Sequence, residues 1–369
     1  MLIEPRDPLV VRDGRPFSSS PGARALSLPF PLPQTLAGAI RTRIGLAQGL
    51  SFPEAAVQVR QIGIQGPLLA ERHDDNWRLM VPAPADCVLL AEGDKPHRYR
   101  LLPLSLGAGV RTNLPEGLNP VGIPRPSSKS KPLAVPRFWG WSAFEEWLLE
   151  PPARSEHDRE HLGHDGPVGE VRTHLKLDPA TQTAEEGFLF QTSGLEFSRK
   201  IGGGSRRLAL ALWVEGAPSG VYPLGGERRL AIWWEQTPAK PEPPLGLLAH
   251  LKLHRAARVI FLTPAVFAAG YLPKERSLHG AKVEAVALGR VVTASGWDLE
   301  HHHPKPSRRL VPAGSTYFVR FPGWNEAEVE TWLKEVWMQN LSNAPQDRLD
   351  GYGLAVVGSW TGKLEALEV

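Results

Sequence analysis

The residues best suited to chemistry are arginines and lysines that stand beside glycines and prolines in loop-like stretches. Guanidinium and ammonium groups bind phosphate oxygens, and glycines let the main chain approach a polyanion closely. The set comprises Arg12, Gly14, Arg15, Arg24, Lys129, Lys131, Arg137, Arg199, Lys200, Arg206, Arg207, Lys305, Arg308 and Arg309. Each group taken alone also fits an ordinary solvated loop. Together they indicate binding of a phosphate backbone, and Phe17, Phe138 and Trp139 offer rings that could stack on exposed bases.

Histidines form a second set of candidates. His157, His161 and His164 lie close together in a charged stretch, and His301 to His303 precede a proline. A metal site of the His-Asp type would need ligands spread over several long helices, which such a proline-rich chain does not predict. We therefore expect solvated loops, no metal and no cofactor. The chain also contains no Walker A sequence and no Gly-x-Ser-x-Gly elbow, so the usual anchors of nucleotide hydrolysis and ester chemistry are missing.

Composition narrows the class of protein. The 369 residues are 42% hydrophobic and 22% charged, which is ordinary for a globular protein with room for two domains. The net charge is only +3, so any nucleic-acid surface must come from local clustering. Cys87 is the single cysteine, which excludes an intrachain disulfide and favours the cytoplasm. The first residues resemble no secretory signal, and the apolar stretch 259–272 is interrupted by Pro264, so no membrane role is expected.

Local patterns predict the elements that position these residues. Thirty-six prolines and 36 glycines indicate many ordered loops and few long helices. Leu36, Ile40 and Ile44 predict a helix between Pro33 and Gly49, preceded by a short strand at 9–11. A short helix is expected at 141–149, with Ser142 and Glu145 as a capping box. A last helix carries the stripe Val329, Trp332, Leu333, Val336 and Trp337 behind an Asn325 and Glu328 cap, and leads to an apolar strand at 351–360.

These elements make the chain begin and end with β-α-β units. The predicted fold is α+β, with two ferredoxin-like (RRM-like) domains that carry extended loops and β-hairpin insertions. We expect an N-terminal domain at 1–135, a connecting helix and charged loop at 136–172, and a C-terminal domain at 173–369.

Several segments, taken in order, carry a family resemblance. They are IEPRDPLVVRDGRPF, LPFPLPQTLAGAIRTRIG, THLKLDPATQTAEEGFLFQTSGLEF, LGGERRLA, SGWDL, PKPSRRLVPAGSTYF and GYGLAVVGSW. Together they resemble the RAMP-superfamily subunit of type III-B CRISPR (Cmr) effector complexes that caps the foot of the complex. The resemblance implies two ferredoxin-like domains, no catalytic centre, and a role in holding the 5′ repeat-derived handle of the guide RNA.

The resemblance also implies site residues and partners. It places a glycine-rich loop at Gly351, Gly353 and Gly358, and an N-terminal loop at Arg12, Gly14 and Arg15. A β-hairpin directed toward guide RNA would carry Lys176 and Thr183. Expected partners are the guide RNA, target RNA, the large polymerase/cyclase-like subunit and the first backbone subunit of the filament.

Three functions remain open from the sequence. The first is a noncatalytic RNA-binding scaffold. The second is a metal-independent guide-RNA endonuclease that uses His157, His161 or His164. The third is a spacer that binds only proteins.

Overall fold

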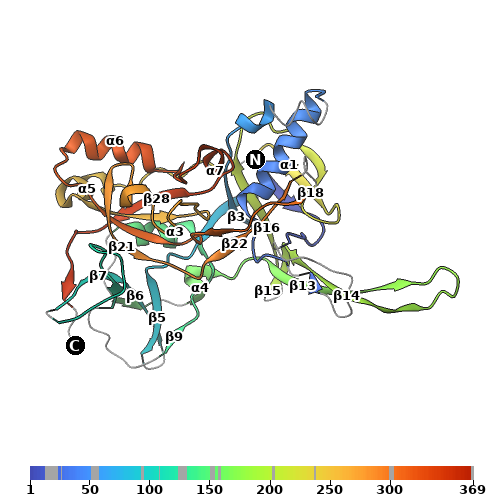
Figure 1. Cartoon of the computed structure of the whole chain (residues 1–369), viewed down its shortest axis with the longest axis horizontal. Helices are drawn as coiled ribbons and strands as arrows, with labels where there is room; N and C mark the ends of the chain where they lie inside the picture. Colours follow the sequence, from blue (N-terminus) through green and yellow to red (C-terminus); the bar gives the residue numbers. More distant parts are fainter. Residues whose placement is uncertain are drawn as a thin grey trace.

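The computed structural model describes residues 1–12, 24–25, 27–50, 58–92, 95–107, 109–123, 131–149, 154–156, 159–201, 204–236, 238–298 and 303–366. Two large sheets form the body, and a long β-hairpin projects from it (Figure 1). The α+β class predicted from the sequence is confirmed. Within the described ranges, no helix combines the length and the apolar character needed to cross a membrane.

The first sheet has the strand order β12-β10-β4-β3-β16-β1-β18-β17. β1 lies between β16 and β18, is antiparallel to both, and places Ile3 opposite Leu210. α1 (Pro33–Ala47) covers one face, because Leu36, Ile40 and Ile44 form the predicted stripe and are buried in the same core as Ile3. The strands are β1 (Leu2–Pro5), β3 (Gln65–His73), β4 (Asn76–Pro82), β10 (Phe138–Gly140), β12 (Gly163–His164), β15 (Ser198–Ile201, paired with β16), β16 (Gly204–Trp213), β17 (Gly220–Pro223) and β18 (Leu230–Trp234).

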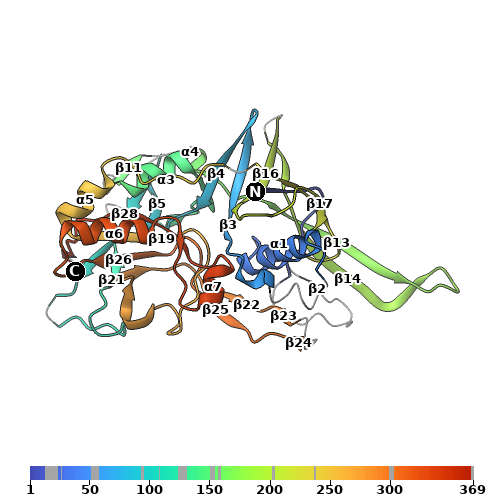
Figure 2. The ribbon, with the colours of Figure 1, turned by 90° about the horizontal axis from the view of Figure 1, so that it is seen from above.

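The second sheet has the order β20-β21-β26-β19-β28-β27. α6 (Glu326–Val336) packs on it beside α5 (Leu247–His254), as Figure 2 shows from above. The predicted cap of α6 is confirmed: the Asn325 side chain accepts a hydrogen bond from the Glu328 N–H at 3.0 Å, and the Glu328 carboxylate accepts one from the Asn325 N–H at 2.7 Å. The strands are β19 (Ala256–Phe261), β20 (Ser277–Leu278), β21 (Ala281–Ala287), β26 (Thr316–Arg320), β27 (Gln339–Asn340) and β28 (Leu354–Ser359).

Both sheets share one central strand order. β3-β16-β1-β18 in the first sheet and β21-β26-β19-β28 in the second are antiparallel throughout. In each set, the first strand along the chain lies between the third and the fourth, and the second pairs with the third. Each sheet has one crossover helix, α1 after β1 in the first and α6 before β28 in the second. The other two crossovers, 214–229 and 262–276, contain no α-helix.

The sheets do not follow the predicted boundaries near residues 135 and 172. β16, β17 and β18 lie in the expected C-terminal domain, yet they complete the sheet of β1 and β3. α3 (Trp141–Leu148), expected in a connecting segment, places Phe144 and Trp147 in one core with Val356 of β28. Local patterns locate a strand but do not show which distant strand returns to pair with it. α3 also starts after Gly140 without a side-chain cap, so the predicted Ser142 capping box is wrong.

Smaller elements fill the segments between these strands. They are η1 (Val59–Gln61), β5 (Cys87–Glu92), β6 (Lys95–Arg100), β7 (Leu102–Ser105), β8 (Val121–Gly122), β9 (Pro132–Leu133), β11 (Arg154–Glu156), α4 (Arg159–Leu162), η2 (Lys274–Arg276), β22 (Val292–Ala294), β23 (Trp297–Asp298), β24 (His303–Pro304), β25 (Arg308–Leu310), α7 (Pro345–Leu349) and β29 (Glu365–Ala366). β22 pairs with β25 and β23 with β24, so the insertion between β21 and β26 folds back on itself through two antiparallel strand pairs.

The projecting hairpin consists of β13 (Val168–Leu177) and β14 (Ala184–Glu196), and β2 (Arg24–Ala25) joins β14 in parallel. It occupies the region where the resemblance implied a hairpin. Lys176 lies along it with its ammonium 2.7 Å from Glu185, and Thr183 lies in its turn. Val171 and Leu175 are largely exposed, since the described part of the chain leaves their side of this ribbon uncovered.

One buried ion pair connects Asp86, between β4 and β5, to the second sheet. The guanidinium of Arg258 on β19 lies 2.6 Å from the carboxylate of Asp86, and neither side chain is exposed. Arg258 also donates to the carbonyl oxygens of Ser359 and Trp147, at 2.7 and 2.5 Å. The Asp86 carboxylate accepts further hydrogen bonds from the Trp147 indole at 3.0 Å and the Thr316 hydroxyl at 3.3 Å. Every polar group of the pair is thereby satisfied inside the core.

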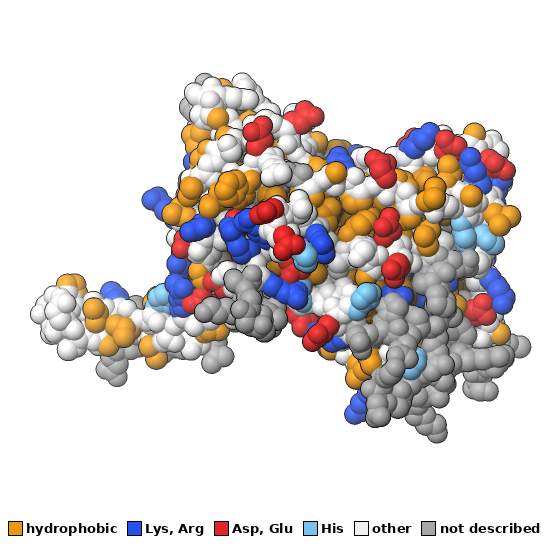
Figure 3. All heavy atoms as spheres, turned by 180° about the vertical axis from the view of Figure 1, so that it is seen from behind, with side chains coloured by type: hydrophobic (Ala, Val, Ile, Leu, Met, Phe, Trp, Pro, Cys, Tyr) orange, Lys and Arg blue, Asp and Glu red, His pale blue; other side chains and the backbone are white. Residues whose placement is uncertain are grey.

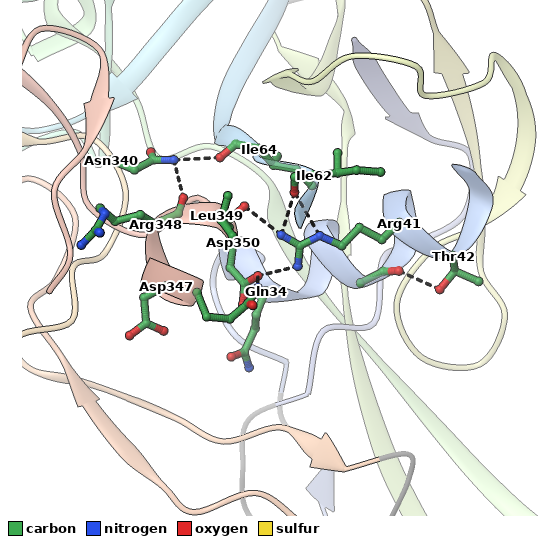
Figure 4. Close-up of polar contacts among 12 residues, drawn as sticks. Gln34, Arg41, Thr42, Ile62, Ile64, Asn340, Asp347, Arg348, Leu349 and Asp350 are labelled. Carbon is green, nitrogen blue, oxygen red and sulfur yellow. Dashed lines mark hydrogen bonds and ion pairs between the residues drawn. The ribbon is translucent and has the colours of Figure 1, made fainter. Parts of the chain in front are cut away.

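A second polar cluster joins α1 to the C-terminal part of the chain (Figure 4). Arg41 of α1 donates to the carbonyl oxygens of Ile62 and Leu349, at 2.8 and 2.9 Å from Nη2. Its Nη1 lies 2.5 Å from the Asp350 carboxylate. One guanidinium therefore fixes the end of α7 against α1, directly before the turn that contains Gly351.

Candidate nucleic-acid interface

Arginines gather at one end of the first sheet. The register sets Ile3 opposite Leu210 and Leu208 opposite Glu71, so the end of β1, the start of β16 and the end of β3 lie together. β4 begins at the same end, with Arg78 opposite Glu71. This group, called the basic end below, comprises Arg6, Arg72, Arg78, Arg206 and Arg207. In Figure 3 a cluster of Lys and Arg side chains lies on the body beside the root of the projecting hairpin.

Two carboxylates hold the inner arginines of the basic end in place. Arg207 forms a two-pronged contact with Glu4, with its Nε 2.7 Å from Oε1. Arg206 places Nη1 2.9 Å from Glu71. Partial burial would raise the pKa of Glu71, but its contacts with His164 and Arg206 lower it, so this carboxylate is ionised at neutral pH. Both side chains remain more than one-third exposed, at 43% for Arg206 and 38% for Arg207, which leaves them accessible to a phosphate.

The base of the hairpin continues this surface along the chain. Leu9 bridges to Leu195 of β14, Arg12 bridges to Ser27, and Arg24 on β2 lies opposite Gln191. β14 leads directly into β15, whose Arg199 and Lys200 pair through their backbones with Arg206 and Ser205. The structure thus brings several of the predicted cations onto connected strands: Arg12, Arg24, Arg199, Lys200, Arg206 and Arg207. Gly14, Arg15, Phe17 and Lys129, which the sequence also indicated, lie outside the described residues.

The remaining predicted cations lie elsewhere. Lys131 is exposed just before β9, and Arg137 is exposed just before β10. Lys305, Arg308 and Arg309 belong to the insertion between β21 and β26, where Arg308 pairs with Asp347 at 2.6 Å. The 5.5 Å contact of Arg308 with the Tyr352 ring anchors that insertion near the Gly351 turn. The predicted residues therefore form more than one surface.

The glycines expected in the RNA-binding loop are buried. Gly351 has a φ of +98°, and a Cβ there would lie 2.6 Å from the Gly66 carbonyl oxygen. Gly353 has a φ of +85°, and a Cβ there would lie 2.7 Å from the Ser342 nitrogen. Gly358 lies inside β28, where a Cβ would meet the Arg258 guanidinium at 3.1 Å. Internal packing and left-handed backbone explain these glycines. The interpretation of Gly351 and Gly353 as surface RNA contacts does not fit their burial. Trp139, expected as a stacking platform, is fully buried as well.

The histidines do not assemble a metal site within the described ranges, where no group of three or more potential ligands occurs. His157 lies outside those ranges, and His161 is exposed on α4. His164 accepts a hydrogen bond at Nδ1 from the Gly166 N–H at 2.9 Å and directs Nε2 toward Glu71 at 3.7 Å. Since Nδ1 accepts, the ring proton lies on Nε2. Only 12% of this side chain is exposed, which leaves little access for a substrate.

Arg6, Arg72 and Arg78 were not found by sequence reasoning. None of them has an adjacent glycine, so the loop motif used above does not mark them. Only the pairing of β1, β3, β4 and β16 brings them together. Strand register of this kind was the missing signal.

Comparison with known proteins supplies a family. The family model described as CRISPR-associated protein (Cas_Cmr3) matches residues 1–360. No relative was found among curated protein sequences. A chain in a cryo-EM structure of the Type III-B Cmr-beta bound to cognate target RNA is 15% identical, with a TM-score of 0.50 over 100% of this chain and 98% of that chain. That likeness shows a shared fold.

Two further solved structures are more distant. A chain of the Type III-B Cmr-beta bound to cognate target RNA and AMPPnP is 14% identical, with a TM-score of 0.47 over 91% of this chain and 88% of that chain. A chain of a Csm3-Csm4 subcomplex of the type III-A CRISPR-Cas interference complex is 11% identical, with a TM-score of 0.32 over 87% of this chain and 94% of that chain.

Proposed function

Because the chain belongs to the CRISPR-associated Cas_Cmr3 family and is thus a subunit of a type III-B CRISPR effector complex, we propose that it is a noncatalytic scaffold that holds the 5′ handle of the guide RNA. The observation that carries the proposal is the basic end of the first sheet, which adjoins the root of the projecting hairpin. Its guanidinium groups are braced by carboxylates and still exposed, an arrangement suited to phosphate oxygens.

The proposal assigns different partners to different parts of the molecule. RNA lies along the basic end and the root of the hairpin. The large polymerase/cyclase-like subunit and the first backbone subunit flank the chain on the remaining surfaces, so that the chain bridges them. The exposed aliphatic side chains of β13 and β14 favour such contacts, because a two-stranded ribbon with uncovered apolar residues is only marginally stable in water.

The test compares two ion-paired surface cations in the assembled complex. Arg206→Ala removes a cation from the basic end, and Lys334→Ala removes one from α6, where Lys334 pairs with Glu330 at 3.0 Å. Retention of handle-bearing guide RNA is measured as a function of salt. We expect Arg206→Ala to weaken retention and to reduce the salt slope by about 1, while Lys334→Ala leaves both unchanged. Equal behaviour of the two variants would remove the basic end from the RNA interface.

The endonuclease alternative is tested with the same material. A nuclease that uses His161 or His164 would cleave precursor guide RNA without metal, and a histidine-to-alanine change would abolish the cleavage. We expect intact RNA with the wild-type chain, since the imidazole of His164 accepts a hydrogen bond at Nδ1 and its side chain is only 12% exposed. Cleavage that disappears in His164→Ala would replace the scaffold proposal with an enzymatic one.

A further inference from the structure

An apolar pocket of about 350 Å³ opens between the two sheets. The first sheet contributes residues 67–69 of β3 and 82–83 near the end of β4. The second contributes residues 262–264 and 312–313, and residues 28–33 and 135–138 complete the lining. This volume lies near the lower end of the range of about 300–1,000 Å³ that is typical of small-molecule sites. The pocket therefore suits one planar heterocycle with its sugar rather than a protein helix or strand.

Prolines and aliphatic side chains make up most of this lining, and two aromatic rings, Phe30 and Phe138, join them. The rings of Phe30 and Phe138 have centroids 5.1 Å apart and planes inclined at 51°. Phe138 is 5% exposed, while Phe30 is only half-buried, so one ring is fixed in the core and the other stays accessible. The absence of a side chain at Gly166 leaves room for the Phe138 ring, because a Cβ at that position would lie 2.6 Å from it. Faces of this kind stack on nucleobases with little dependence on the base.

Charge is confined to the border of the pocket. Among the described lining residues, Arg137 is the charged one. Its guanidinium lies 5.5 Å from the centre of the Phe138 ring and donates to the Pro29 carbonyl oxygen at 3.2 Å, and its main-chain N–H donates to Asp165 at 3.3 Å. Partial burial lowers the pKa of Arg137 and the Asp165 charge opposes this, but a guanidinium stays cationic at any physiological pH.

One cation lies at the border of an otherwise uncharged pocket. Val292 of β22 also lines the pocket, while Arg308 on the paired strand β25 contacts Asp347 at 2.6 Å. An apolar interior with Arg137 at its border matches a nucleotide, whose base is uncharged and whose phosphate is anionic. An aliphatic side chain from a partner protein would make no use of this cation.

We propose that this pocket receives one unstacked base of the guide RNA, with the adjoining phosphate held at Arg137. The base enters against Phe30 and Phe138, and the strand continues along the protein surface. This inference rests on the proposed RNA-holding function and adds to it a position at which a single nucleotide leaves the stack. Phe138 thereby acts from inside a pocket instead of on an open surface.

A wild-type measurement tests the pocket without any substitution. Guide RNAs that carry one 4-thiouridine at successive positions are assembled into the complex, irradiated and digested. We expect one position to cross-link to the peptides that contain residues 28–33 or 135–138. Cross-links spread evenly over many positions, or absent from both peptides, would overturn the pocket.

Three variants add an energetic test. Phe30→Ala removes the accessible ring, Phe30→Leu keeps apolar volume without a face for stacking, and Ala313→Trp fills space in the lining. Guides with one 2-aminopurine report the environment of each base. We expect all three variants to change the signal at the cross-linked position alone, and Phe30→Ala to weaken guide retention about 5- to 150-fold, the equivalent of about 1–3 kcal/mol for one stacked base.

The outcomes separate this inference from the proposal beneath it. A wild-type complex that retains guide RNA but shows no position sensitive to the pocket variants would overturn the pocket alone. A wild-type complex that holds no guide through this chain would overturn both. Free adenosine monophosphate or uridine monophosphate is also tested on the guide-free complex. If it binds, if Ala313→Trp abolishes that binding, and if the guide signals stay unchanged, the pocket belongs to a free nucleotide and its assignment to guide RNA is overturned.

Discussion

Removal of the buried guanidinium of Arg258 gives the strongest test of how the core is held together. Arg258→Met leaves the Asp86 carboxylate in the core without a counter-charge, since both side chains are 0% exposed. It also leaves the Ser359 and Trp147 carbonyl oxygens, which Arg258 contacts at 2.7 and 2.5 Å, without that donor. Loss of one partner of a buried pair costs about 3–5 kcal/mol. We expect a loss of that size in the free energy of unfolding.

The assay is urea unfolding followed by tryptophan fluorescence and circular dichroism. Arg309→Met is the matched control, because Arg309 is exposed and should change stability by less than about 0.5 kcal/mol. The double variant Arg258→Met/Asp86→Asn removes the stranded charge but keeps a side chain that can still contact Trp147. It should recover about 1–3 kcal/mol relative to Arg258→Met. A loss below about 1 kcal/mol for Arg258→Met, or no recovery in the double variant, would refute this account of the core.

Three further predictions concern stability and reactivity. Gly353→Ala should destabilise the protein by about 1–3 kcal/mol, because the φ of Gly353 is +85°. Gly38→Ala, on the exposed side of α1, should instead stabilise it by about 0.5–1 kcal/mol. The melting temperatures of the two variants test both signs. Arg41→Met should cost about 1.5–3 kcal/mol and speed hydrogen exchange over residues 345–353; unchanged exchange there would contradict the role of this contact. Burial raises the pKa of the Cys87 thiol, so the native thiol should resist disulfide reagents at pH 8. An unfolded thiol ionises near pH 8.5, so above that pH the unfolding free energy should fall by up to about 1.4 kcal/mol per pH unit, a slope that Cys87→Ala removes.

Local periodicity was sufficient to predict α1 and α6, but it did not indicate α5, which also packs on the second sheet. The stripe on Leu36, Ile40 and Ile44 lies within four turns of chain, and the Asn325 cap is a contact between neighbours in sequence. Strand pairing is different, because an apolar strand such as β1 carries no mark of its partner. For that reason the sequence did not indicate that β16 and β18 pair with β1.

The candidate site was predicted in part. Arg206 and Arg207 were found because they follow a glycine run, and the structure places them at the basic end. Arg72 and Arg78 were not found, since their closeness depends on the register of β3 and β4. Gly353 was assigned to RNA through the family resemblance, yet a left-handed turn inside the fold requires glycine equally.

Because β1 lies in the middle of the first sheet, the formation of that sheet depends on how far synthesis of the chain has advanced. β1 ends at Pro5, while its two neighbours begin at Gly204 and Leu230. At about 5–20 residues per second, a ribosome needs about 10–40 s to reach β16 after finishing β1. During that time both edges of an apolar strand remain without their native partners, which invites mispairing. A fragment that stops at residue 172 would stay in this state, so the first sheet is a product of nearly two-thirds of the chain and cannot be produced from its N-terminal half.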